Sequence, residues 1–341
     1  MPSKVDPQDE LRHWPESVAK QLDDLIATHA HKGQFACFDM DDTSWQFDLE
    51  SSLLPFLENK GVLTRDTMDP SLRLIPFKDS PDQQESLFSY SQRLYHLGDS
   101  IYYSFSSQIF SGISLRDLKI YVDELMDSTE PISTNYYKDN TLTTAEVHPP
   151  KIFRGQVELY NKLTTNGIDV YVITASSEEL VRMVASDPKY GYNVKPENVI
   201  GTTLLMKNLK SGEITTSRKQ IADGTYSEKA TQNAAADLVM TTYLWAPATW
   251  MIGKWAAILS HIDEWKKPIL VAGDSPVSDT PMLFHGANVE KGGMRLWISR
   301  TDACRQKIGK LIKEAAHKQE AEGLAITADK NWLFVTPEEI L

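Results

Sequence analysis

Residues 35–43 read FACFDMDDT, in which four apolar residues run directly into a cluster of carboxylates. A short apolar run of this kind is typical of a β-strand that is buried on both faces of a parallel sheet. In an open parallel sheet, ligands bind beyond the carboxyl ends of the strands. We therefore predict a central strand at 35–38, with Asp39, Asp41 and Thr43 at the mouth of a ligand site.

The chain around this stretch alternates between helical and strand-like patterns. Residues 9–30 have apolar positions at helical spacing, and the alternation continues after residue 150. This rhythm predicts an α/β fold with a parallel sheet. The expected helices lie at 152–163, 178–185, 255–262 and 303–320, and the expected strands at 170–173, 269–272, 296–298 and 332–335.

Residues 48–150 interrupt this rhythm, because they read as aromatic-rich helices with little strand-like alternation. The turn-forming sequence His-Pro-Pro at 148–150 closes the interruption. We expect a core domain of residues 1–47 and 151–341 and an inserted helical cap of residues 48–150. Residues 201–250, with a predicted hairpin turn at 207–212, fit a second lid, a dimer surface or an addition to the sheet edge. The expected cap helices lie at 51–58, 84–96, 101–110 and 115–126.

Charge and composition exclude several classes of protein. The formal net charge of −12 provides no basic surface for a nucleic acid backbone, so no nucleic acid partner is expected. No run of eighteen apolar residues predicts a membrane span, and residues 1–10 hold no apolar stretch of signal-peptide type. Cys37 and Cys304 are too few for a disulfide framework or a cysteine-based zinc site. We expect a cytoplasmic protein, and its oligomeric state is not indicated.

The carboxylates after the first strand suit phosphoryl transfer. That reaction needs an in-line nucleophile, a proton donor for the leaving group and positive charge near the phosphoryl oxygens. Asp39 can attack, and Asp41 can serve as general acid and then as general base. Thr43 either hydrogen-bonds the phosphate or fixes the loop. Taken alone, an acidic turn fits a helix cap or a surface loop equally well.

Three further segments add to this interpretation. The strand at 170–173 is followed by Thr174 and Ala175, whose hydroxyl and backbone amides would offer an anion site at the start of the next helix. The strand at 269–272 is followed by GDSPVSD, in which Asp274 and Asp279 are able to share a hard cation such as Mg²⁺. Lys254 heads a predicted helix and would balance the negative charges of the nucleophile and the phosphate.

In this order, the motifs DxDxT, strand-terminal Thr, Lys and GDxxxxD resemble those of the haloacid dehalogenase superfamily over about residues 35–280. The resemblance implies a Rossmann-like core with an inserted cap. It also implies an Mg²⁺-dependent phosphatase, since dehalogenating members lack a carboxylate where this chain has Asp41. The implied roles are nucleophile for Asp39, acid/base for Asp41, phosphate binding for Thr174 and Lys254, metal ligands for Asp39, Asp274 and the Asp41 carbonyl, and support of the metal's water for Asp279.

A closer resemblance concerns the substrate, a small-molecule phosphate ester. Residues 38–43, 48–57, 172–176 and 273–279 look like those of bacterial phosphorylcholine phosphatases, and the cap is similar to that of the phosphoserine phosphatase-like branch. Those bacterial enzymes are exported, whereas the polar residues 1–10 lead us to expect no signal peptide here. Aromatic faces and carboxylates recognise a quaternary ammonium group, although aromatic residues at helical spacing more often belong to a core. The candidates for this recognition are Trp45, Asp48, Glu50, Tyr102 and Tyr103.

Other functions remain compatible with the residues to different degrees. A phosphotransferase or mutase would use the same aspartyl-phosphate, because water and an alcohol compete for one intermediate. A binding protein that had lost catalysis is disfavoured, since the nucleophile and the metal-ligand positions all carry the required residues. A dinucleotide oxidoreductase is disfavoured because no predicted strand runs into a GxGxxG turn.

Overall fold

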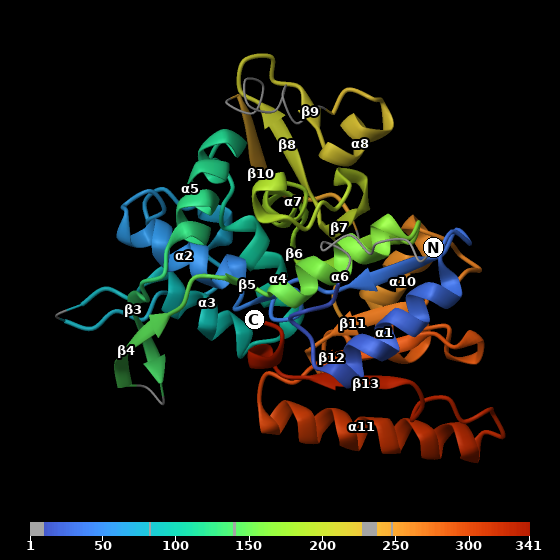
Figure 1. Ribbon diagram of the computed structural model, residues 1–341. Helices are drawn as coiled ribbons and strands as arrows, with labels where there is room; N and C mark the ends of the chain where they lie inside the picture. Colours follow the sequence, from blue (N-terminus) through green and yellow to red (C-terminus); the bar gives the residue numbers. More distant parts are fainter. Residues whose placement is uncertain (1–9, 82, 139–140, 227–236, 247) are drawn as a thin grey trace.

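The computed structural model describes residues 10–341 apart from residues 82, 139, 140, 227–236 and 247. Its main sheet has the strand order β13-β12-β11-β1-β6-β7, and every neighbouring pair is parallel (Figure 1). The prediction of an α/β fold on a parallel sheet is confirmed. The strands are β1 (Phe35–Phe38), β6 (Asp169–Ser177), β7 (Val199–Thr202), β11 (Leu270–Gly273), β12 (Met294–Ile298) and β13 (Trp332–Val335).

The order of the strands places a ligand site beside β1. From β1 the chain adds β6 and β7 on one side and then returns to add β11, β12 and β13 on the other. A crevice forms at such a switch point, beyond the carboxyl ends of the strands. Asp39 and Asp274 follow the two strands that meet there, β1 and β11, which pair in register from Ala36–Leu270 to Phe38–Ala272.

Helices cover both faces of this sheet, so the core domain has three layers. Ala36 and Phe38 face one hydrophobic cluster, and Phe35 and Cys37 face the other. All four residues of β1 are buried, which confirms the predicted central strand. The first cluster contains residues of α1 (Glu16–His29), α6 (Arg154–Thr165) and α7 (Glu178–Ala185), and the second contains residues of α10 (Ile252–His261) and α11 (Asp302–Ala321).

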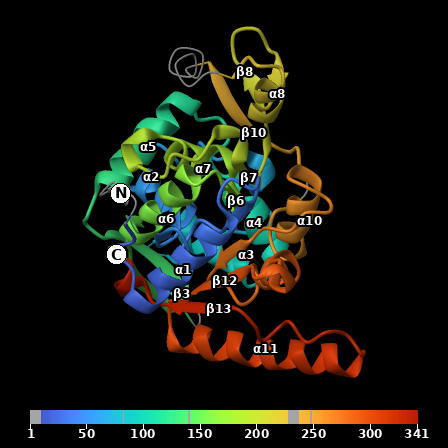
Figure 2. The same ribbon diagram turned by 45° about the vertical axis from the view of Figure 1, so that its right-hand side comes forward.

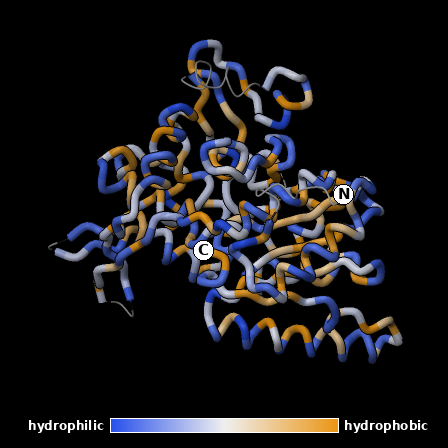
Figure 3. The backbone as a smooth tube through the Cα atoms, in the orientation of Figure 1, coloured by the Kyte–Doolittle hydropathy of each residue, from blue (hydrophilic) through white to orange (hydrophobic). Residues whose placement is uncertain are grey.

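The outermost helix, α11, lies along the edge of the core domain near β13 (Figures 1 and 2). Its colour alternates between apolar and polar along its length, as expected of a helix with one face on the protein and one in solvent (Figure 3). None of the helices in the described part of the chain has the length and apolarity needed to cross a membrane.

The insertion contains helices and a hairpin. The antiparallel hairpin of β3 (Ile132–Lys138) and β4 (Thr141–Val147) differs from the prediction of helices alone. Its strands, ISTNYYK and TLTTAEV, are half-exposed and rich in Thr and Tyr, so they show no apolar alternation even though these residue types favour strands. The helices are α2 (Leu49–Asn59), α3 (Leu87–Tyr95), α4 (Asp99–Gln108) and α5 (Leu115–Asp127).

Two short paired strands connect the insertion to the core. They are β2 (Trp45–Gln46) and β5 (Lys151–Ile152), which pair antiparallel. Between β2 and α2, Phe47 has a positive φ of 70° and stacks on His148, with 5.0 Å between ring centroids. The chain thus leaves and re-enters the core through one narrow ribbon.

The segment 201–250 builds a small antiparallel sheet of its own, with the strand order β10-β8-β9 (Figure 1). The predicted turn is present, because Gly212 has a φ of 74° and donates its N–H to the Asn208 carbonyl. Gly201 and Thr202 end the edge strand β7 of the main sheet, whereas the later strands of the segment form a separate sheet and do not extend that edge. Residues 227–236 lie outside the described chain. The elements are β8 (Leu204–Asn208), β9 (Ile214–Thr215), α8 (Ser217–Ala222) and β10 (Leu238–Leu244).

This small sheet contacts the insertion. The N–H of Gly112 donates to the Met240 carbonyl at 2.9 Å, and Gln108 Nε2 donates to the Thr242 carbonyl at 2.5 Å. Both donors belong to the insertion and both acceptors to β10. The insertion and the small sheet therefore meet where the end of α4 and the turn after it approach β10 (Figures 1 and 2).

Candidate active site

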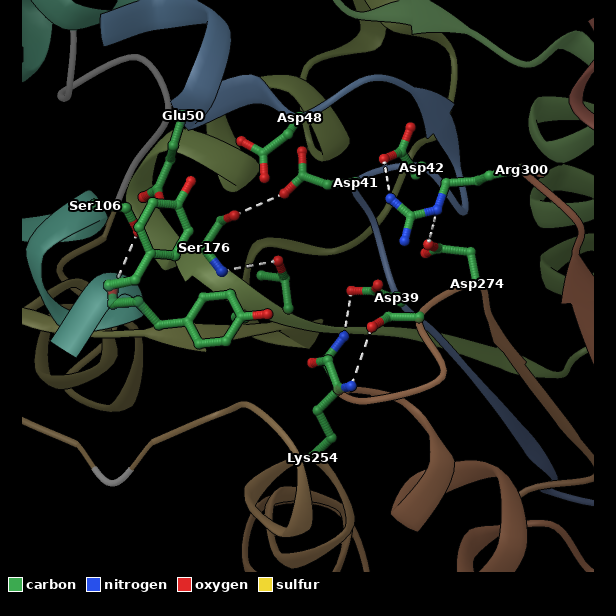
Figure 4. Close-up of a pocket in the computed structure, with 16 residues that line it drawn as sticks. Asp39, Asp41, Asp42, Asp48, Glu50, Ser106, Ser176, Lys254, Asp274 and Arg300 are labelled. Atoms are coloured by element: carbon green, nitrogen blue, oxygen red, sulfur yellow. Dashed lines mark hydrogen bonds and ion pairs between the residues drawn. The ribbon is translucent and has the colours of Figure 1, made fainter. Parts of the chain in front are cut away.

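One pocket lies at the carboxyl edge of the main sheet, between the core and the insertion (Figure 4). Its wall holds an excess of negative charge, which favours the binding of cations. The strand-terminal loops after β1 and β11 contribute carboxylates, and the first turn of α2 contributes two more from the insertion. The charged lining residues are Asp39, Asp41, Asp42, Asp48, Glu50, Asp274, Lys254 and Arg300.

Lys254 and Asp39 form the floor of this pocket. Lys254 Nζ lies 2.5 Å from Asp39 Oδ1 and 2.7 Å from Asp279 Oδ1, and its side chain is 1% exposed. A buried ammonium group requires such partners. Burial, with a further contribution from Asp279, raises the pKa of Asp39 to about 7, and Lys254 opposes that rise. The structure thus brings together the predicted nucleophile and the predicted lysine.

Asp279 shapes the loop after β11 and does not line the pocket. Its Oδ2 accepts hydrogen bonds from the N–H groups of Asp274 and Ser275, at 2.9 and 2.8 Å. A Cβ atom on Gly273 would lie 2.7 Å from the Asp279 side chain, so the loop requires glycine there. Oxygens of Asp39, Asp274 and Asp279 nevertheless lie within 4.8 Å of one another, as a cluster of hard ligands.

The structure places Thr43 and Asp274 together. Thr43 Oγ1 donates to Asp274 Oδ1 at 2.7 Å, and the Thr43 side chain is fully buried behind the pocket wall. This position contradicts a direct contact of Thr43 with phosphate and agrees with the alternative that it fixes the loop. The reason is the approach of β11 to β1, which brings a carboxylate within reach of the hydroxyl.

Asp41 is held by three donors. Trp45 Nε1 and the Leu49 N–H donate to Oδ1, each at 2.9 Å, and Ser176 Oγ donates to Oδ2 at 2.6 Å (Figure 4). Burial, together with the charge of Asp48, raises the pKa of Asp41 to about 7, while these hydrogen bonds lower it. A carboxyl group that titrates near pH 7 is suited to both donating and accepting a proton.

Trp45 has a different position from the one predicted. Its side chain is fully buried and lies outside the pocket lining, so it orients Asp41 and does not form a substrate surface. Ser176 was missed as a site residue. Its motif is visible in the sequence, but its partner lies 135 residues away and becomes apparent only in the fold.

Thr174 and Ala175 line the pocket as predicted, but from a strand instead of a helix start. β6 continues to Ser177, and α7 begins at Glu178. The Ser177 N–H at the end of the strand donates to Glu50 Oε1 at 2.7 Å. The amide at the helix start thus binds a carboxylate of the protein, while the Thr174 hydroxyl, which accepts the Ser176 N–H at 3.1 Å, lines the pocket.

The insertion contributes two carboxylates and two tyrosines to the pocket. Asp48 is the N-cap of α2, where Oδ1 accepts the Ser51 N–H at 2.7 Å, and Glu50 Oε1 accepts the Ser107 hydroxyl at 3.1 Å. Burial raises the pKa of Asp48 to about 6 and that of Glu50 to about 7.

Both tyrosines are placed by aromatic or polar neighbours. The Tyr102 hydroxyl lies 3.0 Å from Ser51 Oγ. The Tyr103 ring packs on Trp250 with 5.5 Å between centroids and an angle of 31°. Trp250 belongs to the segment 201–250, so this segment and the insertion meet beside the pocket.

Arg300 was missed entirely. It follows β12 and lies in the pocket wall, where its guanidinium pairs with Asp274 and Asp42 at 2.6 Å each. Asp42 has a positive φ of 58°, which Asp and Asn tolerate better than most residues. The available signal was a basic residue two positions after a predicted strand, which is too common to indicate a site.

Comparison with known proteins gives one relative of high identity. A phosphorylcholine phosphatase from Pseudomonas aeruginosa is 57% identical over 331 residues, which cover 97% of this chain and 93% of the relative. A solved structure of a functionally unknown protein from Anaerococcus prevotii has a TM-score of 0.59 at 20% identity, covering 91% of this chain and 93% of that one. One of unknown function from Bordetella pertussis has a TM-score of 0.49 at 14% identity, covering 89% and 98%. No protein-family model matches the chain.

Proposed function

Because this chain belongs to the phosphorylcholine phosphatase family of the haloacid dehalogenase superfamily, we propose that it is a phosphomonoesterase that hydrolyses phosphocholine. The observation that carries the proposal is the buried pair of Asp39 and Lys254 on the pocket floor, with Asp41 in the same pocket wall. A carboxylate, a cation and a second carboxyl group that titrates near pH 7 are the parts that phosphoryl transfer through an aspartate requires.

The reaction has two steps in this proposal. An oxygen of Asp39 attacks phosphorus, the bond to the choline oxygen breaks, and Asp41 gives its proton to that leaving oxygen. Water then attacks the phosphorus of the aspartyl-phosphate, Asp41 takes a proton from that water, and the bond to Asp39 breaks to release phosphate. Lys254 and the Thr174 hydroxyl would stabilise the phosphoryl oxygens in both steps.

A divalent cation fits the donor set of this site. Asp39 and Asp274 offer carboxylate oxygens, which are the ligands that Mg²⁺ prefers, and the superfamily adds the backbone carbonyl of Asp41. Mg²⁺ bound there would supply positive charge toward the phosphoryl oxygens. Asp279 would act from behind these residues, because its own oxygens bind Lys254 and two backbone N–H groups.

The charged end of the substrate would face the insertion. A trimethylammonium group has no hydrogen-bond donor, so carboxylates and aromatic faces are the groups that bind it. Four residues of the insertion line the same pocket as Asp39: Asp48 and Glu50 at the start of α2, and Tyr102 and Tyr103 in α4. We propose that these four residues make the site selective for a cationic phosphate ester. In this division residues 48–150 are the cap, and residues 1–47 and 151–341 are the catalytic core.

The test is phosphate release from phosphocholine, phosphoethanolamine, phosphoserine and p-nitrophenyl phosphate, with Mg²⁺ or with EDTA. We expect release to require the metal, to be fastest with phosphocholine, and to disappear in Asp39→Asn. Folded protein that binds Mg²⁺ but releases phosphate from none of these esters would contradict the proposal. Transfer of the phosphoryl group to an added alcohol in preference to water would instead indicate a phosphotransferase.

A further inference from the structure

Arg300 is a charged pocket residue that lies outside the four sequence motifs. Its side chain is 35% exposed at the carboxyl end of β12. Its Nε lies 2.6 Å from Asp274 Oδ2, and its Nη1 lies 2.6 Å from Asp42 Oδ2. Figure 4 shows the guanidinium between these two carboxylates, which belong to the loops after β11 and β1. One cation therefore connects the two loops that form the site.

Both carboxylate oxygens of Asp274 are engaged in this arrangement. Oδ1 accepts the Thr43 hydroxyl and Oδ2 pairs with Arg300, while the Asp274 side chain is only 2% exposed. A divalent cation at the proposed metal site needs an oxygen of this same carboxylate. Two cations that share one buried carboxylate repel each other strongly, because the surroundings screen their charges poorly.

The two basic residues of the pocket, Lys254 and Arg300, pair with different carboxylates. Lys254 pairs with Asp39 and Asp279, whereas Arg300 pairs with Asp274 and Asp42. Without such partners, these carboxylates would repel one another in a buried site. In the metal-free protein, the positive charge of Arg300 thus balances the negative charge of Asp274. A bound metal ion would balance that same carboxylate.

We propose that Arg300 is the resident counter-ion of Asp274, which stabilises the metal-free site and competes with the divalent cation for that carboxylate. The protein would therefore bind its metal more weakly than the ligands alone allow, and would keep the site in order without metal. This inference rests on the proposed function, because it requires a metal ion at Asp39 and Asp274.

The test compares Arg300→Gln with the wild-type chain in two measurements. By calorimetric titration with MgCl₂, we expect the Kd for Mg²⁺ to fall on the order of tenfold in the variant, because a charge-assisted bond to Asp274 no longer opposes binding. In thermal unfolding, the variant should have a lower Tm than the wild type in EDTA. That difference should shrink with saturating Mg²⁺, because the tighter-binding chain gains more stability from its ligand.

Two further variants complete the design. Lys310→Gln removes one positive charge from the solvent side of α11, where Lys310 pairs with Glu314, and should leave the Kd unchanged. Arg300→Lys keeps the charge but replaces the planar fork that reaches both carboxylates. It should bind Mg²⁺ more tightly than the wild type and less tightly than Arg300→Gln, and it carries the test if that variant does not fold.

Two results would overturn the proposal alone: Arg300 variants that bind Mg²⁺ no more tightly than a wild type that does bind it, or a Tm deficit that is equal with and without metal. A wild-type chain that binds no divalent cation would instead remove the metal assignment on which the proposal rests. The failures of the inference and of the proposed function are therefore distinguishable.

Discussion

The hydroxyl of Ser176 donates a hydrogen bond of 2.6 Å to Asp41 Oδ2, from the end of β6 to the loop after β1. Asp41 Oδ1 accepts two further hydrogen bonds, from the Trp45 indole and the Leu49 N–H. The proposed acid/base is therefore oriented by residues of both the core and the base of the insertion, and of these three donors Ser176 also lines the pocket.

Ser176→Ala should slow the protonation of a poor leaving group. We expect first-turnover release of choline from phosphocholine to fall about tenfold, because one charge-assisted hydrogen bond orients the proton donor. Release of p-nitrophenol should change less, since that anion leaves without a proton. Rapid-quench measurement of both products compares the two losses. Ser176→Thr keeps a hydroxyl and should restore the rate of choline release. An equal loss for both esters would mean that Ser176 does not act through Asp41.

The raised pKa of the Glu50 carboxyl should make the free energy of unfolding depend on pH. Its pKa is raised from the ordinary 4.5 to about 7 by burial, so between these values the folded chain holds a proton that the unfolded chain has released. The free energy of unfolding contributed by Glu50 must therefore decrease as the pH rises from about 4.5 to about 7.

Glu50→Gln should remove that decrease while it keeps an acceptor for Ser177. We expect the variant to gain about 1–3 kcal/mol relative to the wild type between pH 5 and pH 8. Urea unfolding in EDTA at both pH values measures the gain. Parallel pH profiles for the two chains would show that Glu50 is ionised throughout this range.

The sequence was sufficient to predict the elements whose signal is local. β1 has four consecutive apolar residues before Asp39, and α7 was predicted with its observed bounds, Glu178–Ala185. The hairpin of β3 and β4 was not predictable from alternation, because its exposed Thr and Tyr side chains bury little apolar surface.

The site residues also divide into those that a sequence motif indicates and those whose contacts depend on the fold. Asp39 and Lys254 belong to ordered motifs, and the fold brings them together as those motifs imply. Thr43 and Trp45 also belong to the first motif region, yet both bind carboxylates of the protein. The partner of Thr43 follows the neighbouring strand β11, 231 residues away, whereas Trp45 binds Asp41 within the same stretch of chain. Arg300 has no motif, and its ion pair with Asp274 depends on the position of β12 beside β11.

Asp48→Asn tests the recognition of a cationic ester. Asparagine is also a good N-cap, so α2 should keep its first turn while the pocket loses a negative charge. We expect the KM for phosphocholine to rise about tenfold, since a charge near an ammonium group is worth more than 1 kcal/mol in a poorly screened site. The KM for 3,3-dimethylbutyl phosphate, the uncharged analogue of the same shape, should stay within a factor of two. Equal changes for the two esters would assign Asp48 to the helix cap alone.

Gly273→Ala should disrupt the loop that carries Asp274. An added Cβ would lie 2.7 Å from Asp279 Cβ and 2.8 Å from its Oδ2, so Asp279 would have to leave Lys254 and the two N–H groups that it accepts from. We expect a loss of about 2–4 kcal/mol in the free energy of unfolding, as for other broken buried networks, and a severe loss of phosphatase activity. The control is Gly309→Ala in α11, where an added Cβ meets no atom within 4 Å and helix propensity favours alanine by about 0.5–1 kcal/mol. Urea unfolding of both variants, with kcat for phosphocholine, separates the steric effect from a general effect of alanine. If Gly273→Ala were as stable and active as Gly309→Ala, the contact between Gly273 and Asp279 would not hold the site together.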